Sequence, residues 1–338
     1  MRATGYRVWA QSYDRDLDDV FAVQGDIARM ITRSLAVRLT AAEATQMGSP
    51  YTTNKKAEEL FEAGLKLYRN FIPTDNAQAR TKFEAAIRED PKFATAYALL
   101  STAHRQDWIM GWIRDYEPSK QQAFQNANTA VQLAMNEPDQ KSSLPQALLQ
   151  RGFAHLYAGK LQDATKDAEE SIKRSPNFAD GYALAAHILC YQMRPLDALN
   201  KMNPTVTRDP KYPYNYYYYT GHAYYVLGYL TPKTDPRRTA HFREAEKHLK
   251  NALSGKDKGP NFRPASSYLV ATLSELGRQR EAAEQTASQP RPEYVRDPKN
   301  LEEYINRILP YTDPVIRTHL IGLWQAADRG VRALPKRP

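Results

Sequence analysis

The sequence predicts an all-α fold, an α-solenoid of about six helical hairpins stacked along one axis. Three observations predict it. Ala, Leu, Glu, Gln, Lys and Arg dominate the 338 residues and glycine is sparse at 15, a composition that favours helices. A short phrase around proline recurs along the chain. Upstream of each copy, small or aromatic residues fall on one helical stripe, as the packed face of a hairpin requires.

The recurring phrase marks the boundary between one hairpin and the next. Each copy holds a proline and an aromatic residue, and a tyrosine follows the aromatic by four positions, at Tyr97, Tyr182 and Tyr216. The copies are Asp90-Pro91-Lys92-Phe93, Ser175-Pro176-Asn177-Phe178 and Asp209-Pro210-Lys211-Tyr212, with a partial fourth at Gly259-Pro260-Asn261-Phe262. Pro176 and Pro210 are 34 residues apart, a period typical of helical-hairpin repeats.

The second helix of each hairpin carries a stripe of small residues before its proline. Steps of four and three residues place each stripe on one face, where short side chains let antiparallel helices approach closely. The stripes are Ala79, Phe83 and Ala86; Ala164, Ala168 and Ser171; and Ala198, Met202 and Thr205. Two insertions, Asp107–Ile113 and Tyr229–Arg238, lengthen the turns of the second and fifth hairpins.

These repeats resemble tetratricopeptide (TPR) repeats over residues 53–289, and the resemblance implies a right-handed superhelix. The stretches Gly5–Arg15 and Asp19–Ile27 resemble the junction between a TolB-like α/β segment and a TPR array in bacterial multidomain signalling proteins. Leu309–Pro314 and Leu323–Ala327 resemble the terminal cap of such arrays. We therefore expect residues 1–52 to be a remnant of the TolB-like junction plus an N-terminal helix, and residues 290–338 to be a C-terminal helical cap.

The resemblance also implies a function. Such arrays are attached to class III adenylate or guanylate cyclases, to winged-helix regulators and to some kinases. It favours a non-catalytic module of bacterial signalling that binds a peptide, a partner helix or a neighbouring domain. The alternatives are the sensory tail of a winged-helix DNA-binding regulator and a cryptic enzyme.

Sequence motifs of catalysis are missing from the chain. It has no phosphate-binding G-x-x-x-x-G-K-[ST] loop, no G-x-G-x-x-G, no H-E-x-x-H, no paired Cys-x-x-Cys and no G-x-S-x-G. The aspartates that bind metal in a cyclase core have no counterpart either. The single cysteine, Cys190, lies in an apolar stretch and is expected to pack rather than react. We expect no enzymatic activity, no cofactor and no metal site.

The charge and the hydropathy of the chain restrict the classes of partner and the cellular location that we expect. The net charge of +9 comes from dispersed Lys and Arg, without a dense basic cluster, so we expect no direct nucleic-acid binding. The mean hydropathy is −0.68 and no apolar run is long enough to span a bilayer. Met1–Asp19 lacks the pattern of a secretory signal. We expect a cytoplasmic protein whose partner is a protein or peptide.

The candidate binding site is the concave face, which the first helices of successive hairpins line in arrays of this kind. The repeat register places an aromatic set there, and tyrosine suits peptide recognition because it combines large contact area with a polar tip. The predicted site residues are Tyr68, Arg69, Arg105, Phe153, Tyr157, His187, Tyr191, Tyr218, His222 and Tyr225.

Alternatives remain for several of these residues. Tyr214 and the run Tyr216–Tyr219 cover every side of a helix, so some of the rings must pack between hairpins. His187 and His222 occupy equivalent places and form either a paired polar contact or part of a metal site. The lysine and asparagine clamp for C-terminal carboxylates is not matched, because its places hold Phe61, Ala98, Leu149 and Ala183. Arg69 and Arg105 can still orient an acidic segment.

Overall fold

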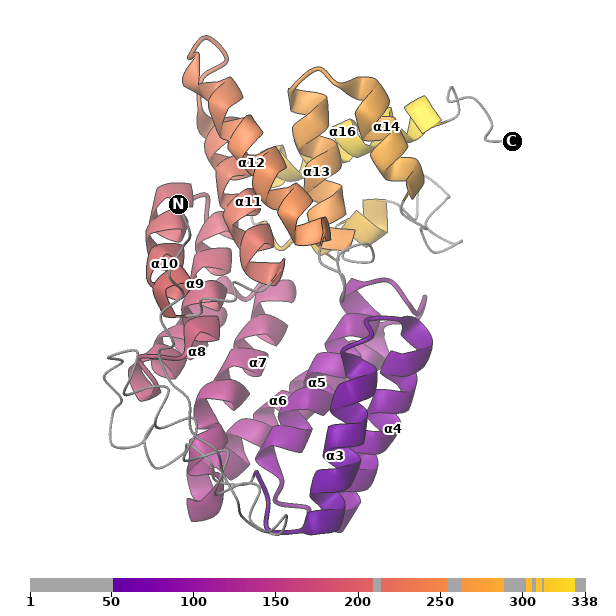
Figure 1. The fold of residues 1–338 in the computed structure, drawn as a ribbon, viewed down its shortest axis with the longest axis vertical. Helices are drawn as coiled ribbons and strands as arrows, with labels where there is room; N and C mark the ends of the chain where they lie inside the picture. Colours follow the sequence, from indigo (N-terminus) through magenta and orange to yellow (C-terminus); the bar gives the residue numbers. More distant parts are fainter. Residues whose placement is uncertain are drawn as a thin grey trace, which may run out of the picture.

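The computed structural model describes residues 51–208, 214–254, 263–288, 302–305, 308–311 and 313–331, and these residues form helices without a strand. The helices pair into six successive hairpins, followed by one further long helix, in the order that Figure 1 colours from indigo to yellow. The predicted all-α solenoid of about six hairpins is confirmed. The expected TolB-like junction lies outside the described residues.

The hairpins have these bounds. The first three are α3 (Lys55–Tyr68) with α4 (Pro73–Glu89), α5 (Ala94–Ile109) with α6 (Glu117–Asn136), and α7 (Leu144–Tyr157) with α8 (Leu161–Arg174). A 3-10 helix, η2 (Pro138–Ser143), joins α6 to α7. The next three are α9 (Ala179–Tyr191) with α10 (Pro195–Arg208), α11 (Tyr214–Leu230) with α12 (Arg237–Ser254), and α13 (Arg263–Glu275) with α14 (Gln279–Ser288); α16 (Pro314–Val331) packs on the last of them.

Local signals in the sequence set the helix ends. The side chain of Asn54 caps α3 by accepting a hydrogen bond from the Ala57 amide at 3.1 Å. Proline in the first turn begins α4 and α6, where its missing N–H costs nothing. Gly159, with a φ of +75°, ends the first helix of the third hairpin in a left-handed conformation that favours glycine.

The stripe of small residues forms the contact between paired helices. Ala79, Phe83 and Ala86 are fully buried, and an added Cβ at Gly64 would lie 2.8 Å from the Phe83 ring. The first insertion also packs inward. Trp108 is 2% exposed, and the Trp112 ring meets Phe71 with ring centroids 5.7 Å apart. These tryptophans therefore cover neighbouring helices.

The hydrophobic core is divided into two clusters. One is built from α3 to α6 and the start of α7. The other runs from Leu149 to α16 and also includes Phe71 and Trp108–Met110 of the first two hairpins. Polar side chains of α5 and α7 lie between them: Thr102, Arg105, Gln106 and Gln150, all buried. The division places a polar zone on the inner side of the second and third hairpins.

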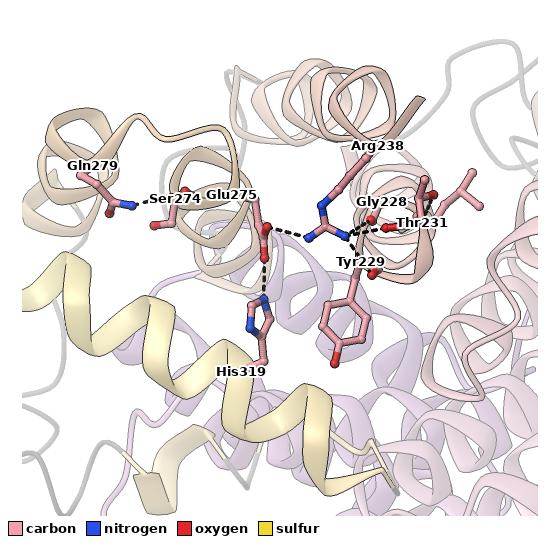
Figure 2. Close-up of polar contacts among 9 residues, drawn as sticks. Gly228, Tyr229, Thr231, Arg238, Ser274, Glu275, Gln279 and His319 are labelled. Atoms are coloured by element: carbon pink, nitrogen blue, oxygen red, sulfur yellow. Dashed lines mark hydrogen bonds and ion pairs between the residues drawn. The ribbon is translucent and has the colours of Figure 1, made fainter. Parts of the chain in front are cut away.

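The last helix is held by a polar network at its contact with the array. Arg238, at the start of α12, caps the end of α11 through its Nη1, and its Nη2 lies 2.8 Å from Glu275 Oε2 (Figure 2). The capped carbonyls are those of Gly228, Tyr229 and Thr231. Glu275 Oε1 in turn meets His319 Nε2 of α16 at 2.5 Å. Burial tends to raise the pKa of Glu275, but the hydrogen bonds from His319 and Arg238 hold it below its usual value.

Candidate functional site

The predicted site residues separate into two groups on the inner face of the array. Four of them, Tyr68, Arg105, Phe153 and Tyr157, line one pocket, to which residues of the first five hairpins contribute. Five lie deeper in the C-terminal half and are at most 1% exposed: His187, Tyr191, Tyr218, His222 and Tyr225. Arg69 follows α3, is exposed, and is not part of the pocket lining.

The buried group forms a cluster of aromatic rings and imidazoles around His222. The His187 and His222 rings are 5.4 Å apart and their Nδ1 atoms are separated by 3.4 Å. Burial lowers the pKa of His187 to about 3, with the Arg105 charge adding to the effect, and burial also lowers the pKa of His222 far below its usual value. Both histidines are therefore neutral at physiological pH, and the pair is a polar contact.

A residue from the C-terminal cap completes this cluster. The Tyr268 hydroxyl donates to the Tyr311 hydroxyl at 3.0 Å, and Tyr311 lies 2.5 Å from His222 Nε2. The Tyr311 hydroxyl thus accepts a hydrogen bond from Tyr268 and has its own hydrogen available for Nε2 of neutral His222, an arrangement in which the His222 hydrogen is on Nδ1. The Tyr311 ring also meets Tyr191 edge-on at 4.8 Å.

The predicted binding site along the whole inner face is not open in the C-terminal half. The five residues do face inward, but Tyr304, Ile305, Leu309 and Tyr311 join the same core and are at most 7% exposed. The physical reason is apolar area, since the chain removes these rings from water by packing its own C-terminal segment on them. An external partner reaches them only if that segment moves.

The N-terminal part of the inner face keeps a cavity of about 160 Å³. Its walls combine aromatic rings with amide, hydroxyl and charged groups. They come from Tyr68, Phe71, Thr102, Arg105, Gln106, Ile109, Met110, Leu149, Gln150, Phe153, Tyr157, Asp180, Tyr214, Asn215 and Tyr219. This cavity, hereafter the Arg105 pocket, is the candidate functional site.

Arg105 is the one cation in the lining of this pocket. Its guanidinium lies over the Phe153 ring at 4.8 Å and over the Tyr157 ring at 5.9 Å, both within the range of cation–π attraction. Its Nη2 donates to Gln150 Oε1 at 3.3 Å. Burial raises the pKa of Tyr157 to about 12, and the nearby Arg105 charge opposes that rise. The tyrosine hydroxyls therefore stay protonated as hydrogen-bonding groups.

Sequence reasoning missed several residues of the pocket. Tyr214, Asn215 and Tyr219 reach it from the start of α11, and Asp180 reaches it from α9. The unbroken tyrosine run hides the helical period that would distinguish Tyr219 from its neighbours. Asp180 carried no signal, because it precedes the inward positions of its helix.

Three other kinds of functional feature concern the described residues: a metal site, a reactive cysteine and a membrane-spanning helix. No three His, Cys, Asp or Glu side chains gather there as a metal site would need. Cys190 is buried, and burial raises the pKa of its thiol, so packing is its role here. None of the helices placed by the structure is long and apolar enough to cross a bilayer.

Sequence comparison finds a relative among cyclases. No family model matches the chain. Over 145 residues, 43% of the chain, it is 32% identical to a protein named putative adenylate cyclase 3 of Rhizobium meliloti (strain 1021). The match covers 25% of that protein, so the chain spans about a quarter of the length of the curated relative it matches.

Structural comparison supports the fold. The alignment with the human IFIT1 dimer with m7Gppp-AAAA covers 94% of this chain and 67% of the IFIT1 chain. Its TM-score is 0.55 and the sequence identity is 15%. The alignment with a monomeric IFIT1 mutant with Gppp-AAAA covers 95% of this chain and 72% of the mutant chain. Its TM-score is 0.58 and the sequence identity is 15%. A tetratricopeptide repeat protein from Parabacteroides merdae ATCC 43184 aligns at a TM-score of 0.42, too low to bear on the fold. The chain is a solenoid of TPR-like hairpins with a relative among putative adenylate cyclases.

Proposed function

We propose that the array is a non-catalytic, regulatory protein-binding module of bacterial cytoplasmic signalling, and that its partner is a peptide, a helix or a neighbouring domain. The single observation that carries the proposal is the Arg105 pocket, an aromatic and polar cavity on the inner face of a helical-repeat fold. Solenoids of this kind use that face to bind extended partners.

The proposed contact residues are Tyr68, Arg105, Phe153 and Tyr157, with Arg69 at the outer edge. Rigid rings give a partner contact area at low entropic cost, and the hydroxyls fix its orientation. The buried cluster that contains His222 supports this surface, because the C-terminal segment holds its five predicted site residues in a fixed arrangement. The similarity to a segment of a putative adenylate cyclase motivates the signalling role.

A protein partner fits the pocket better than a nucleic acid. The IFIT1 structures named above hold m7Gppp-AAAA and Gppp-AAAA, but their likeness to this chain concerns the fold alone. The pocket has a single cation, and Asp180 in the same lining repels a polyphosphate. The winged-helix alternative predicts a DNA-binding domain upstream in the gene, which reading that gene tests directly.

A peptide display experiment tests the proposal. A random peptide library is selected against the full chain, and the site of the selected peptides is mapped by hydrogen–deuterium exchange. We expect protection in α5, in α7 and at the start of α11. Tyr68→Ala should weaken binding of the selected peptides, because this half-buried ring lines the pocket.

The matched control is Tyr224→Ala, which removes a half-buried tyrosine stacked on His248, away from the pocket. It should leave peptide affinity unchanged. Selected peptides that protect only the outer helices, or that bind Tyr68→Ala as well as the unaltered chain, would contradict the proposal. Tighter binding of a triphosphate RNA tetramer than of any selected peptide would also count against it.

A further inference from the structure

Arg105 is a buried cation without an ion-pair partner among the described residues. The residue is 9% exposed, its Nε has no hydrogen-bond acceptor, and its polar contact is the amide oxygen of Gln150. Arg317 of α16 likewise has no carboxylate partner among the described residues, whereas three other partly buried arginines each have one within 2.8 Å. These pairs are Arg80 with Asp107, Arg151 with Asp167, and Arg238 with Glu275.

This contrast has a physical meaning. A guanidinium withdrawn from water loses solvation that an opposite charge normally replaces, so buried arginines are paired. At Arg105 the rings of Phe153 and Tyr157 return only part of that loss through cation–π attraction. The lost solvation of the Arg105 guanidinium is therefore only partly compensated. The group lies in the wall of a cavity, where a hydrogen-bond acceptor would complete that compensation.

The guanidinium is also held in place before any ligand arrives. Gln150 Oε1, which accepts from Arg105 Nη2, lies 2.7 Å from the Thr102 hydroxyl. The Phe153 and Tyr157 rings, one turn apart on α7, also lie within cation–π distance of the guanidinium, which restricts its freedom to turn. A planar, pre-oriented fork matches a carboxylate, which accepts two parallel hydrogen bonds.

Charge decides which anion fits. Among the residues that line the pocket, Arg105 is the one cation and Asp180 the one anion, and Asp180 accepts a hydrogen bond from Tyr216 at 2.8 Å. A phosphate dianion or a polyphosphate would bring more negative charge than one guanidinium balances, beside a carboxylate. A monoanion meets one guanidinium without excess.

We propose that the Arg105 pocket binds a carboxylate of the partner, with Arg105 as the residue that recognises it and the surrounding rings receiving the adjoining apolar group. The inference rests on the proposed function and names the chemistry by which that same site selects its partner. It differs from a lysine and asparagine clamp, because it uses one arginine beside the two aromatic rings of α7.

The test uses the full chain labelled with ¹⁵N-arginine and small probes that differ in one group. N-acetyl-leucine carries a terminal carboxylate, N-acetyl-aspartate amide carries a side-chain carboxylate, and N-acetyl-leucinamide carries none. The Nε–Hε signal of Arg105, identified by its absence from the Arg105→Lys spectrum, should shift with at least one carboxylate probe and not with the amide. Which carboxylate probe binds tells a chain terminus from an acidic side chain.

Affinity measurements complete the test. Arg105→Gln should weaken carboxylate binding about ten- to a hundredfold, the loss expected for a charge-assisted hydrogen bond. Arg88→Lys, an exposed position on α4, should not change it. The spectral test uses the unaltered chain, with Arg105→Lys for assignment only, so a misfolded Arg105→Gln protein does not remove the test.

Each outcome decides between the two proposals. An Arg105 signal that responds equally to the amide, or that responds to inorganic phosphate or adenosine 5′-monophosphate at lower concentration than to either carboxylate, overturns the inference. Selected peptides that occupy the pocket without needing a carboxylate overturn it as well, while the proposed function stands. Carboxylate probes that bind where no peptide does support the inference and defeat the proposed function.

Discussion

Replacing Tyr311 with alanine removes the residue that links the C-terminal cap to the buried ring cluster. Its hydroxyl contacts His222 Nε2 and Tyr268, and its ring is 2% exposed. Tyr311→Phe keeps the ring but leaves two buried polar groups without their partner, a cost of about 1–3 kcal/mol. Tyr311→Ala also empties the volume of the ring, for a total of about 3–5 kcal/mol.

This free energy belongs to local opening of the segment rather than to unfolding of the whole chain. Residues 302–305 and 308–311 follow the six hairpins in the sequence and pack on their inner face, and such a covering segment detaches with less free energy than the core beneath it. Hydrogen–deuterium exchange over 302–311 and α11 measures the opening. We expect faster exchange in both regions, more for alanine than for phenylalanine, with the helical circular dichroism retained. Unchanged exchange of α11 in Tyr311→Ala would refute the idea that this segment covers the inner face.

Three further predictions concern stability. Gly221→Ala should destabilise the fold by about 1–3 kcal/mol, because the added Cβ would lie 2.7 Å from Leu249. Gly322 has open space around it, so Gly322→Ala should stabilise the fold by about 0.5–1 kcal/mol. Thermal unfolding measures both changes. The pKa of His187 is about 3 in the folded chain, below its unfolded value of 6.5. Between these two pH values the unfolded chain binds more protons than the folded chain, so the free energy of unfolding falls as the pH drops from 6.5 towards 3. His187→Gln should reduce this fall between pH 6.5 and about pH 4.5 in urea titrations, and an identical pH slope would show the assignment to be mistaken. Arg238→Met should cost about 3 kcal/mol by the same titration at neutral pH, because it removes the guanidinium from partly buried Glu275, which keeps only His319, and from three carbonyls at the end of α11. A loss below about 1 kcal/mol would contradict a structural role for the pair.

The sequence predicted the hairpins well because their cause is local. Small residues such as Ala79 and Ala86 recur at helical spacing, and each hairpin packs through them on its own partner and neighbour. The same register placed Tyr68, Arg105 and Phe153 on successive first helices, and these residues meet at one pocket. Where repetition determined position, sequence reasoning found the residues that lie together.

The inner face of the C-terminal half was not predictable in this way. Tyr311 belongs to a segment without repeats, and the contact that places it, with His222, spans 89 residues. No periodicity encodes such a pairing. Tyr219 was missed for a different reason, since tyrosines on all sides of α11 make the inward and outward positions look alike.

The contact between His222 and Tyr311 also changes how the chain must fold. In a simple solenoid each hairpin meets only its neighbours, so a unit can form as soon as the next one has been synthesised. Here the core around α9 and α11 is incomplete until residue 311 has left the ribosome. The first hairpins have most of their core in a separate cluster, although Phe71 and Trp108–Met110 belong to the core that Tyr311 completes. Synthesis should therefore yield an early N-terminal unit with its own core and a C-terminal unit whose final packing step waits for residue 311.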